Sequence, residues 1–228
     1  MSRLLRIAQT SVGRKLLMAA TGLAMLGFVV IHLLGNLKVF FGPEEVNSYS
    51  EMLHQHPGII WPARAGLLLF VLCHIVVGAA LWSRSRAARP TGYRRQKTLR
   101  ASLASRLMPV SGLLLLVFIV YHLLHFTFLV VHNEHSHVFD SAGRHDVYAM
   151  VLAAFQNPLL AGGYVLAMLG LGLHLWHGAQ SLPQTLGLHH SAYNGLIRGT
   201  AKVLVVLLVL GFSSLPISIF LGLLTSPG

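Results

Sequence analysis

Long apolar runs constrain the fold of this chain more than any other feature, and five of them occupy 15–41, 62–83, 107–131, 158–181 and 201–224. A helix of about 20 residues crosses the hydrocarbon core of a bilayer, which is roughly 30 Å thick. Backbone polar groups cannot be satisfied by lipid, so segments of this length must be helices rather than open strands. We therefore predict an all-α integral membrane protein, a single domain over 1–228 with five transmembrane helices.

The charged residues predict how these helices are oriented. Three basic residues precede the first run and Lys15 begins it, eight lie in the segment 84–106 and two more are at 198 and 202, so 14 of the 17 Lys and Arg fall on one side. All six Asp and Glu fall on the other side. Basic loops stay in the cytoplasm, so the N-terminus is expected there, with the chain in a bacterial or archaeal cytoplasmic membrane. The first run is too long for a signal-peptide core and is expected to remain as a span.

The net charge of +11 follows from this topology. The basic residues lie in short loops beside the membrane, so nucleic-acid binding is not expected. These loops are instead suited to anionic membrane lipid or to an acidic partner subunit. Cys73 is the single cysteine, which excludes an internal disulfide, a CxxCH haem attachment and a cysteine-ligated iron–sulfur cluster in this chain alone. Any haem must therefore be bound non-covalently.

Each of the first four apolar runs contains a histidine deep inside it: His32, His74, His122 and His174. His32 and His122 both begin His-Leu-Leu, and each lies nine residues before the outer end of its run. His74 and His174 lie nine and seven residues before the inner ends. At about 1.5 Å per residue, one pair is about 13 Å below the outer surface and the other about 11–13 Å above the inner one.

A polar ring at such a depth needs a hydrogen-bond partner or a metal. One histidine alone is commonly satisfied by a neighbouring helix. Four histidines in two depth-matched pairs favour two haems, each held between two imidazoles in a four-helix bundle. The order of the ligands also indicates two parallel hairpins related by an axis along the membrane normal. The run 201–224 has no histidine, so it is expected to pack against the outside of the bundle.

Two glycines and two further histidines lie on the same helical faces as these ligands. Gly78 and Gly178 follow His74 and His174 by four residues, where a missing side chain leaves room for a porphyrin. Close helix packing is the alternative explanation for both glycines. His125 and His177 are rivals for His122 and His174 by i, i+3 spacing, but they lie nearer the helix ends. His177 is suited to the membrane interface or to a haem propionate.

With these residues the chain resembles the large, five-helix, dihaem cytochrome b subunit of succinate:quinone oxidoreductases and quinol:fumarate reductases. The resemblance covers nearly the whole chain and rests on one histidine in each of the first four helices, the HLL steps and the H-x-x-x-G steps. It implies that His32 and His122 ligate an outer haem b, and that His74 and His174 ligate an inner one. It also implies a flavoprotein subunit, which carries the succinate and fumarate chemistry, and an iron–sulfur subunit on the cytoplasmic face. This chain would exchange their electrons with menaquinone or ubiquinone, as in respiratory complex II.

The residues that would serve the quinone are less well marked. Glu51 and Arg64, near the outer end of the second span, are candidates, and the alternative is that they are a solvated loop residue and a helix-end charge. The histidine-rich segment 132–137 can be considered as a surface metal site, and His189-His190 as a solvated turn. Two other functions stay open: the dihaem cytochrome b of a hydrogenase or formate dehydrogenase, and a haem-free membrane anchor or transporter.

Overall fold

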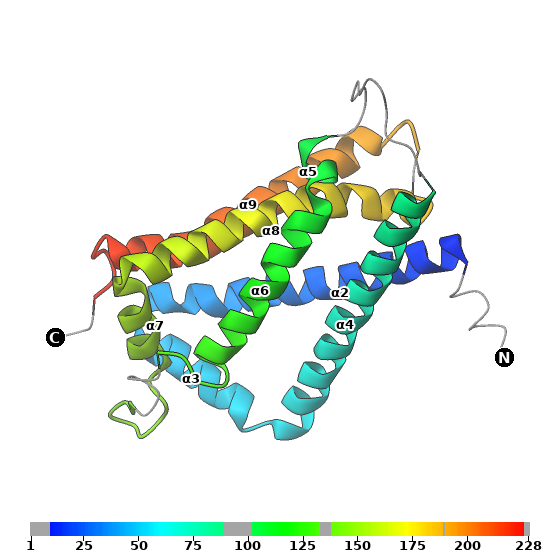
Figure 1. Ribbon diagram of the computed structural model, residues 1–228. Helices are drawn as coiled ribbons and strands as arrows, with labels where there is room; N and C mark the ends of the chain where they lie inside the picture. The colour runs from blue at the N-terminus through cyan, green and yellow to red at the C-terminus, as the bar shows by residue number, and fades with distance from the viewer. Residues whose placement is uncertain (1–9, 89–101, 133–137, 189, 226–228) are drawn as a thin grey trace.

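The computed structural model describes residues 10–88, 102–132, 138–188 and 190–225, and Figure 1 shows them as long helices joined at two ends. Five helices are long and apolar enough to cross a membrane, which confirms the predicted all-helical architecture and indicates a multi-pass membrane protein. They are α2 (Ser11–Leu37), which the 3-10 helix η1 (Lys38–Phe41) extends, α4 (Pro57–Ala87), α6 (Met108–Phe126), α8 (Pro158–Thr185) and α9 (Asn194–Phe220).

Short helices close the two ends of this assembly. At one end lie α3 (Pro43–His54) and α7 (Val147–Gln156), and at the other lies α5 (Leu103–Arg106). Asp146 and Asn157 cap α7 and α8 with their side-chain oxygens, and Pro158 occupies the first turn of α8, where its missing N–H costs nothing. The α3–α7 end contains the main cluster of buried apolar side chains, including Val39, Val46, Leu152, Phe155, Leu215 and Ile219. The sequence did not predict this cap.

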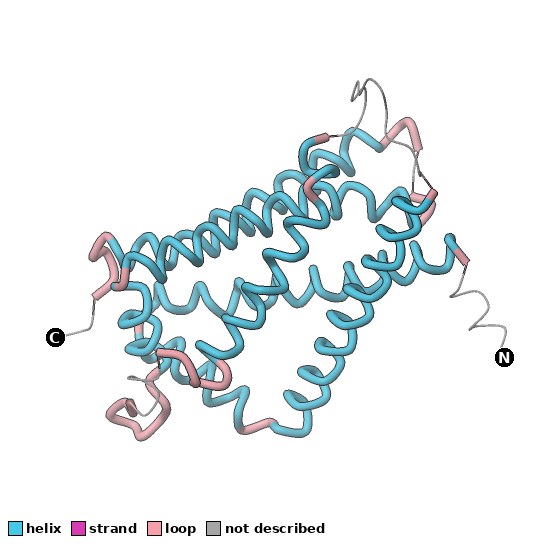
Figure 2. The backbone as a smooth tube through the Cα atoms, in the orientation of Figure 1, coloured by secondary structure: helices cyan, strands magenta, loops and turns pink. Residues whose placement is uncertain are grey.

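The spanning helices pack as two pairs, α2 with α4 and α6 with α8, and α2 also contacts α8. Figure 2 shows the loops gathered at the two ends of the helices. Helix α9 packs most extensively against α8 and also reaches α2. A Cβ at Gly211 of α9 would lie 2.8 Å from Leu33 Cδ2, so glycine permits this approach to α2.

Helix α6 ends at Phe126, five residues earlier than predicted. The chain then turns back over the helix end, and the carbonyls of Leu123 and Leu124 accept hydrogen bonds from the amides of residues 127, 128, 130 and 131. Leu129 and His132 have φ angles of 53° and 54°, in the left-handed region that side chains rarely adopt. This turn directs the chain at His132 back toward the bundle.

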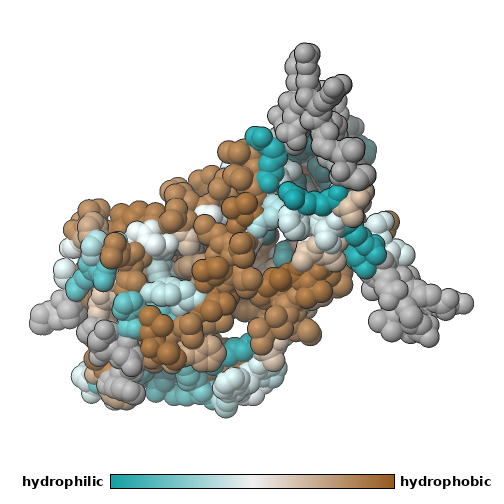
Figure 3. Space-filling view, viewed as in Figure 1, coloured by the Kyte–Doolittle hydropathy of each residue, from teal (hydrophilic) through white to brown (hydrophobic). Residues whose placement is uncertain are grey.

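The surface is apolar between two charged ends. Figure 3 shows hydrophobic side chains across the middle of the molecule and hydrophilic ones near its ends. Large apolar residues along the spans are more than half exposed, among them Leu68, Val76, Val117, Leu166 and Leu207. A continuous exposed apolar belt is a liability in water, but it is the expected lipid-facing surface of a membrane protein. The charged residues divide between the ends as predicted: Arg14, Arg84, Arg106 and Arg198 lie at one end, and Glu44, Glu51, Asp140 and Asp146 at the other.

Candidate functional site

The four intramembrane histidines meet as two pairs. His32 of α2 and His122 of α6 have ring centroids 5.8 Å apart, and His74 of α4 and His174 of α8 have ring centroids 6.4 Å apart. These are the pairs expected from depth. His122, and not its rival His125, faces His32 across the bundle.

A hydroxyl from a neighbouring helix contacts each member of the His74–His174 pair. Thr21 Oγ1 lies 3.0 Å from His74 Nδ1, and Ser111 Oγ lies 3.3 Å from His174 Nδ1. Both hydroxyl residues are buried. The glycine that follows each one lies beside the same imidazole, because a Cβ at Gly22 would be 3.4 Å from His74 Cε1 and one at Gly112 would be 3.5 Å from His174 Cε1.

Aromatic rings surround the His32–His122 pair. Phe28 stacks on His32 and Phe118 stacks on His122, each from one turn earlier in the same helix, at centroid distances of 5.3 and 5.7 Å. Phe212 of α9 lies 5.8 Å from His32, so the fifth helix contributes directly to this layer. We expected α9 to pack against the outside of the bundle, and its close approach at Gly211 also brings Phe212 to this layer.

The polar contacts of this pair differ from those of His74 and His174. Asn36 Nδ2 lies 3.3 Å from His32 Nε2 and also donates to the His32 carbonyl oxygen. Tyr164 Oη of α8 lies 3.5 Å from His122 Nδ1. The two layers therefore surround their imidazoles with different polar groups.

His125 is a buried histidine with a role that the sequence did not predict. The residue is 3% exposed, and its Nδ1 lies 3.0 Å from Tyr164 Oη. It also stacks on Phe126 at a centroid distance of 4.0 Å. Tyr164 thus reaches both His122 and His125, and it links the His32–His122 pair to the end of α6.

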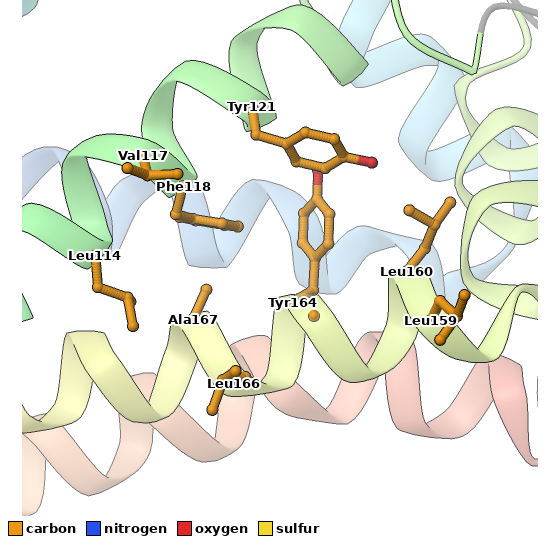
Figure 4. A pocket seen from close by; sticks show the side chains of 10 residues that line it. Leu114, Val117, Phe118, Tyr121, Leu159, Leu160, Tyr164, Leu166 and Ala167 are labelled. Atoms are coloured by element: carbon orange, nitrogen blue, oxygen red, sulfur yellow. The ribbon is translucent and has the colours of Figure 1, made fainter.

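A lipid-side cavity of about 260 Å³ lies between α6 and α8 beside this tyrosine. Figure 4 shows Tyr121 of α6 and Tyr164 of α8 meeting across it, with apolar side chains on the remaining walls. Tyr121 Oη is buried and has no hydrogen-bond partner among the described residues. An unsatisfied hydroxyl on a cavity wall is a donor for a polar group of a ligand.

A second cavity, of about 320 Å³, adjoins the first and shares Leu160 with it. His125, His132 and Asn157 supply its polar lining, and the His125 and His132 rings are 5.5 Å apart. The left-handed turn after α6 is what brings His132 to this position. Tyr164 connects the two cavities through its contact with His125.

The remaining predicted residues are dispersed. Glu51 is exposed on α3, and Arg64 is exposed on α4 with its guanidinium 5.3 Å from the Trp61 ring centroid. Neither forms an ion pair within the described ranges, and the structure does not join them in one pocket. A Cβ at Gly78 would meet Met18 Cε at 3.0 Å, whereas nothing lies within 4 Å of one at Gly178. The role of both glycines in haem clearance stays a prediction.

The proposed surface metal site falls mostly outside the described residues, since 133–137 are not described and only His132 is. Among the residues that are described, no group of three or more His, Cys, Asp or Glu side chains is arranged to hold a metal ion. His177, half-buried on α8, stays a candidate for the interface or a propionate. His190 stacks on Tyr193 and its Nδ1 accepts a hydrogen bond from the Ala192 amide, within a turn; His189 is not described.

A polar network ties α3 to the segment before α7. Asn47, 1% exposed, donates to Asp140 and Asp146 and accepts from the Tyr148 amide. Arg144 binds Glu44 and Asp140. The network fixes the end of the bundle that lies next to the second cavity.

A longer internal repeat accompanies the site than the HLL steps indicated. Residues 17–34 and 107–124 are identical at ten of 18 positions, from Leu17-Met18 to the Leu33-Leu34 that follows His32. Thr21-Gly22 aligns with Ser111-Gly112, and Phe28 aligns with Phe118. The signal for both the hydroxyl–glycine steps and the stacked phenylalanines is therefore present in the sequence, as an alignment of the chain with itself at an offset of 90 residues.

Comparisons of the chain with protein-family models, with curated proteins and with solved structures find no match. Its function is therefore inferred from its own residues and their geometry.

Proposed function

We propose that this chain is the dihaem cytochrome b membrane subunit of a succinate:quinone oxidoreductase, a succinate dehydrogenase or fumarate reductase. The observation that carries the proposal is the pairing of four half-buried histidines from four helices into two layers. His32 and His122 would ligate the outer haem b and His74 and His174 the inner haem b.

The spacing of each pair fits one iron between two imidazoles. A metal–imidazole bond of about 2 Å on each side, with the ring nitrogen about 1.1 Å from its centroid, gives a centroid separation of about 6.2 Å. The observed separations are 5.8 and 6.4 Å. Thr21, which contacts His74, is 11 residues from His32 on α2, so the layers are about 16 Å apart at 1.5 Å per residue.

Bound between such histidines, haem would supply one-electron transfer without an open position for oxygen, because both axial sites are filled. The chain's own contribution is to hold the imidazoles, to exclude water with phenylalanine and leucine side chains, and to set the two layers apart. The polar contacts differ between the layers, which favours two sites of different potential.

Docking of the partner subunits is expected at the end that contains the N-terminus of α2. Its described basic residues are Arg14, Lys15, Arg84, Arg86, Arg106, Arg198 and Lys202. By the positive-inside rule this end is cytoplasmic, where a flavoprotein subunit and an iron–sulfur subunit would bind, and where the same cations would also hold anionic lipid. The succinate and fumarate chemistry would lie on the flavoprotein.

For quinone we favour the two adjoining cavities beside α6 and α8 over the dispersed Glu51 and Arg64. The first opens on an apolar surface and carries the unpartnered Tyr121 hydroxyl, which suits a quinone carbonyl. The second continues through His125 to His132 at the end of the bundle, which gives protons a titratable route. Tyr121→Phe should weaken quinone-analogue binding, with Tyr193→Phe, a tyrosine at the opposite end, as the matched control.

The deciding experiment is a reduced-minus-oxidised absorption spectrum of the full chain, purified from a haem-competent host, with a haem-to-protein ratio. Two b-type haems per chain that do not react with carbon monoxide are expected. A folded preparation without haem would overturn the proposal and favour a haem-free anchor or transporter. Two haems in a chain that co-purifies with a hydrogenase or formate dehydrogenase would instead assign it to that class of complex.

A further inference from the structure

The hydroxyls of Thr21 and Ser111 are committed to their own helices as hydrogen-bond donors. Thr21 Oγ1 donates to the Leu17 carbonyl at 2.8 Å, and Ser111 Oγ donates to the Met108 carbonyl at 3.2 Å. A hydroxyl has one hydrogen and two lone pairs. With the hydrogen directed at the backbone, the lone pairs remain to accept a hydrogen bond from a second group.

That second group is the imidazole of His74 or His174, 3.0 and 3.3 Å away at Nδ1. With the hydroxyl hydrogen on the carbonyl of its own helix, the hydroxyl accepts from Nδ1–H, and the lone pair of the neutral ring is then on Nε2. This is the tautomer that binds a metal through Nε2, with its other nitrogen held by a second group.

The same construction occurs twice, related by the internal repeat. In each hairpin the first helix supplies a hydroxyl residue followed by glycine, and the second helix supplies the histidine that rests on them. A Cβ at Gly22 or Gly112 would be in ordinary van der Waals contact with Cε1 of the imidazole, so the glycines lie beside the ring edge and the hydroxyl sets the direction of the ring. The outer pair is built differently, because the polar neighbours of His32 and His122 are the Asn36 amide and the Tyr164 phenol.

We propose that Thr21 and Ser111 are positioning residues for the inner haem: each accepts the Nδ1–H of one ligand and directs Nε2 at the iron. This inference rests on the proposed function, because it assigns a partner to each inner ligand. Hydrogen bonding at Nδ1 increases the electron donation of an axial imidazole, so the two hydroxyls favour the ferric state of the inner haem.

The test compares Thr21→Val and Ser111→Ala with Thr21→Ser and Ser111→Thr in the full chain. We expect the first two variants to lower the affinity for the inner haem by roughly 10-fold, in the range seen when such outer partners are removed. We also expect them to raise its midpoint potential and to shift the electron paramagnetic resonance signal of its ferric form. The outer haem should be unchanged, and the two conservative variants should behave like the wild type.

Matched controls are available on α9. Thr200 and Ser214 also donate to backbone carbonyls of their own helix, so Thr200→Val and Ser214→Ala remove the same local bond away from the imidazoles of the two pairs. The inner haem is identified as the component that His74→Ala removes. Both controls should retain wild-type potentials and haem content.

The possible results of this test distinguish failure of the positioning role from failure of the proposed haem-binding function. A wild-type chain without haem would overturn both. Two haems in the wild type, with unchanged potential, spectrum and occupancy in Thr21→Val and Ser111→Ala, would overturn only the positioning role. If the α9 controls lost as much haem as the Thr21 and Ser111 variants, the hydroxyls would be general structural elements and the positioning role would be overturned. The same conclusion would follow if the Thr21 and Ser111 variants lost both haems.

Discussion

Arg144 binds both carboxylate oxygens of Glu44, one hundred residues away in the sequence, at 2.9 and 2.6 Å. Its Nε donates to Asp140 at 2.8 Å. The hydrogen bond from Arg144 lowers the pKa of Glu44. Partial burial raises the pKa of Asp140, but hydrogen bonds from the Arg144 amide and guanidinium, from Asn47 and from the Ala142 amide outweigh it and lower that pKa overall. The ion pair between Arg144 and Glu44 joins α3 to the segment that precedes α7.

This end of the bundle should loosen in acid. In the folded protein the pKa values of Glu44 and Asp140 lie below their ordinary values of 4.5 and 3.8. The two carboxylates therefore contribute their full stabilisation of the fold above pH 4.5. They lose it as the pH falls through their lowered folded-state pKa values. We expect the amides of 138–146 to lose hydrogen-exchange protection below about pH 4, by only a few-fold because Glu44 is exposed. Arg144→Gln should show part of the loss at neutral pH and a smaller acid step, because Asn47 and the Ala142 amide still donate to Asp140. An acid step of unchanged size in this variant would exclude the Arg144 contacts as its cause.

Single-histidine variants should each remove one of the two haems. His74→Ala and His174→Ala should reduce the content from two haems per chain to one and delete the same spectral component. His32→Ala and His122→Ala should delete the other. Redox-titrated difference spectra make the assignment, and His177→Ala, on the turn after His174, is the control expected to keep both haems. If His32→Ala and His74→Ala removed the same component, the pairing would be wrong.

Gly170 permits the close contact between α6 and α8. A Cβ there would lie 2.5 Å from Leu114 Cδ2, so Gly170→Val should force the helices apart at a cost of about 1–3 kcal/mol in unfolding free energy. Gly162→Val, on the same helix, adds the same side chain where nothing lies within 4 Å. The midpoint of detergent-induced unfolding measures both. Equal destabilisation would mean that helix propensity, and not the contact with Leu114, sets the cost.

The orientation can be tested with single cysteines. In a Cys73→Ser background, Gln55→Cys places a thiol between α3 and α4, and Ser85→Cys places one near the basic end of α4. If the basic end is cytoplasmic, a membrane-impermeant maleimide should label intact cells at 55 and should label 85 only after permeabilisation. The reverse pattern would place the N-terminus outside and exclude cytoplasmic docking at the basic end.

Much of this molecule could be predicted without coordinates because the bilayer imposes strong one-dimensional rules. The length of the apolar runs identified the five spans, and the charges of the loops between them indicated that the basic residues share one end of the molecule. Helix rise then converted the positions of His32, His74, His122 and His174 into depths, which is why their pairing was predictable. The helix ends were less predictable, as α6 shows, because local turns such as the one at Leu129 depend on hydrogen bonds to specific carbonyls.

Lateral contacts required the tertiary structure. Hydropathy does not distinguish helix faces that contact lipid from faces that contact protein, so neither the approach of Phe212 to His32 nor the burial of His125 against Tyr164 followed from the pattern. The sequence by itself determined that four histidines lie at two depths in four of the five long apolar helices. The tertiary structure decided which side chains surround each imidazole, because those contacts depend on how the helices rotate and pack around one another.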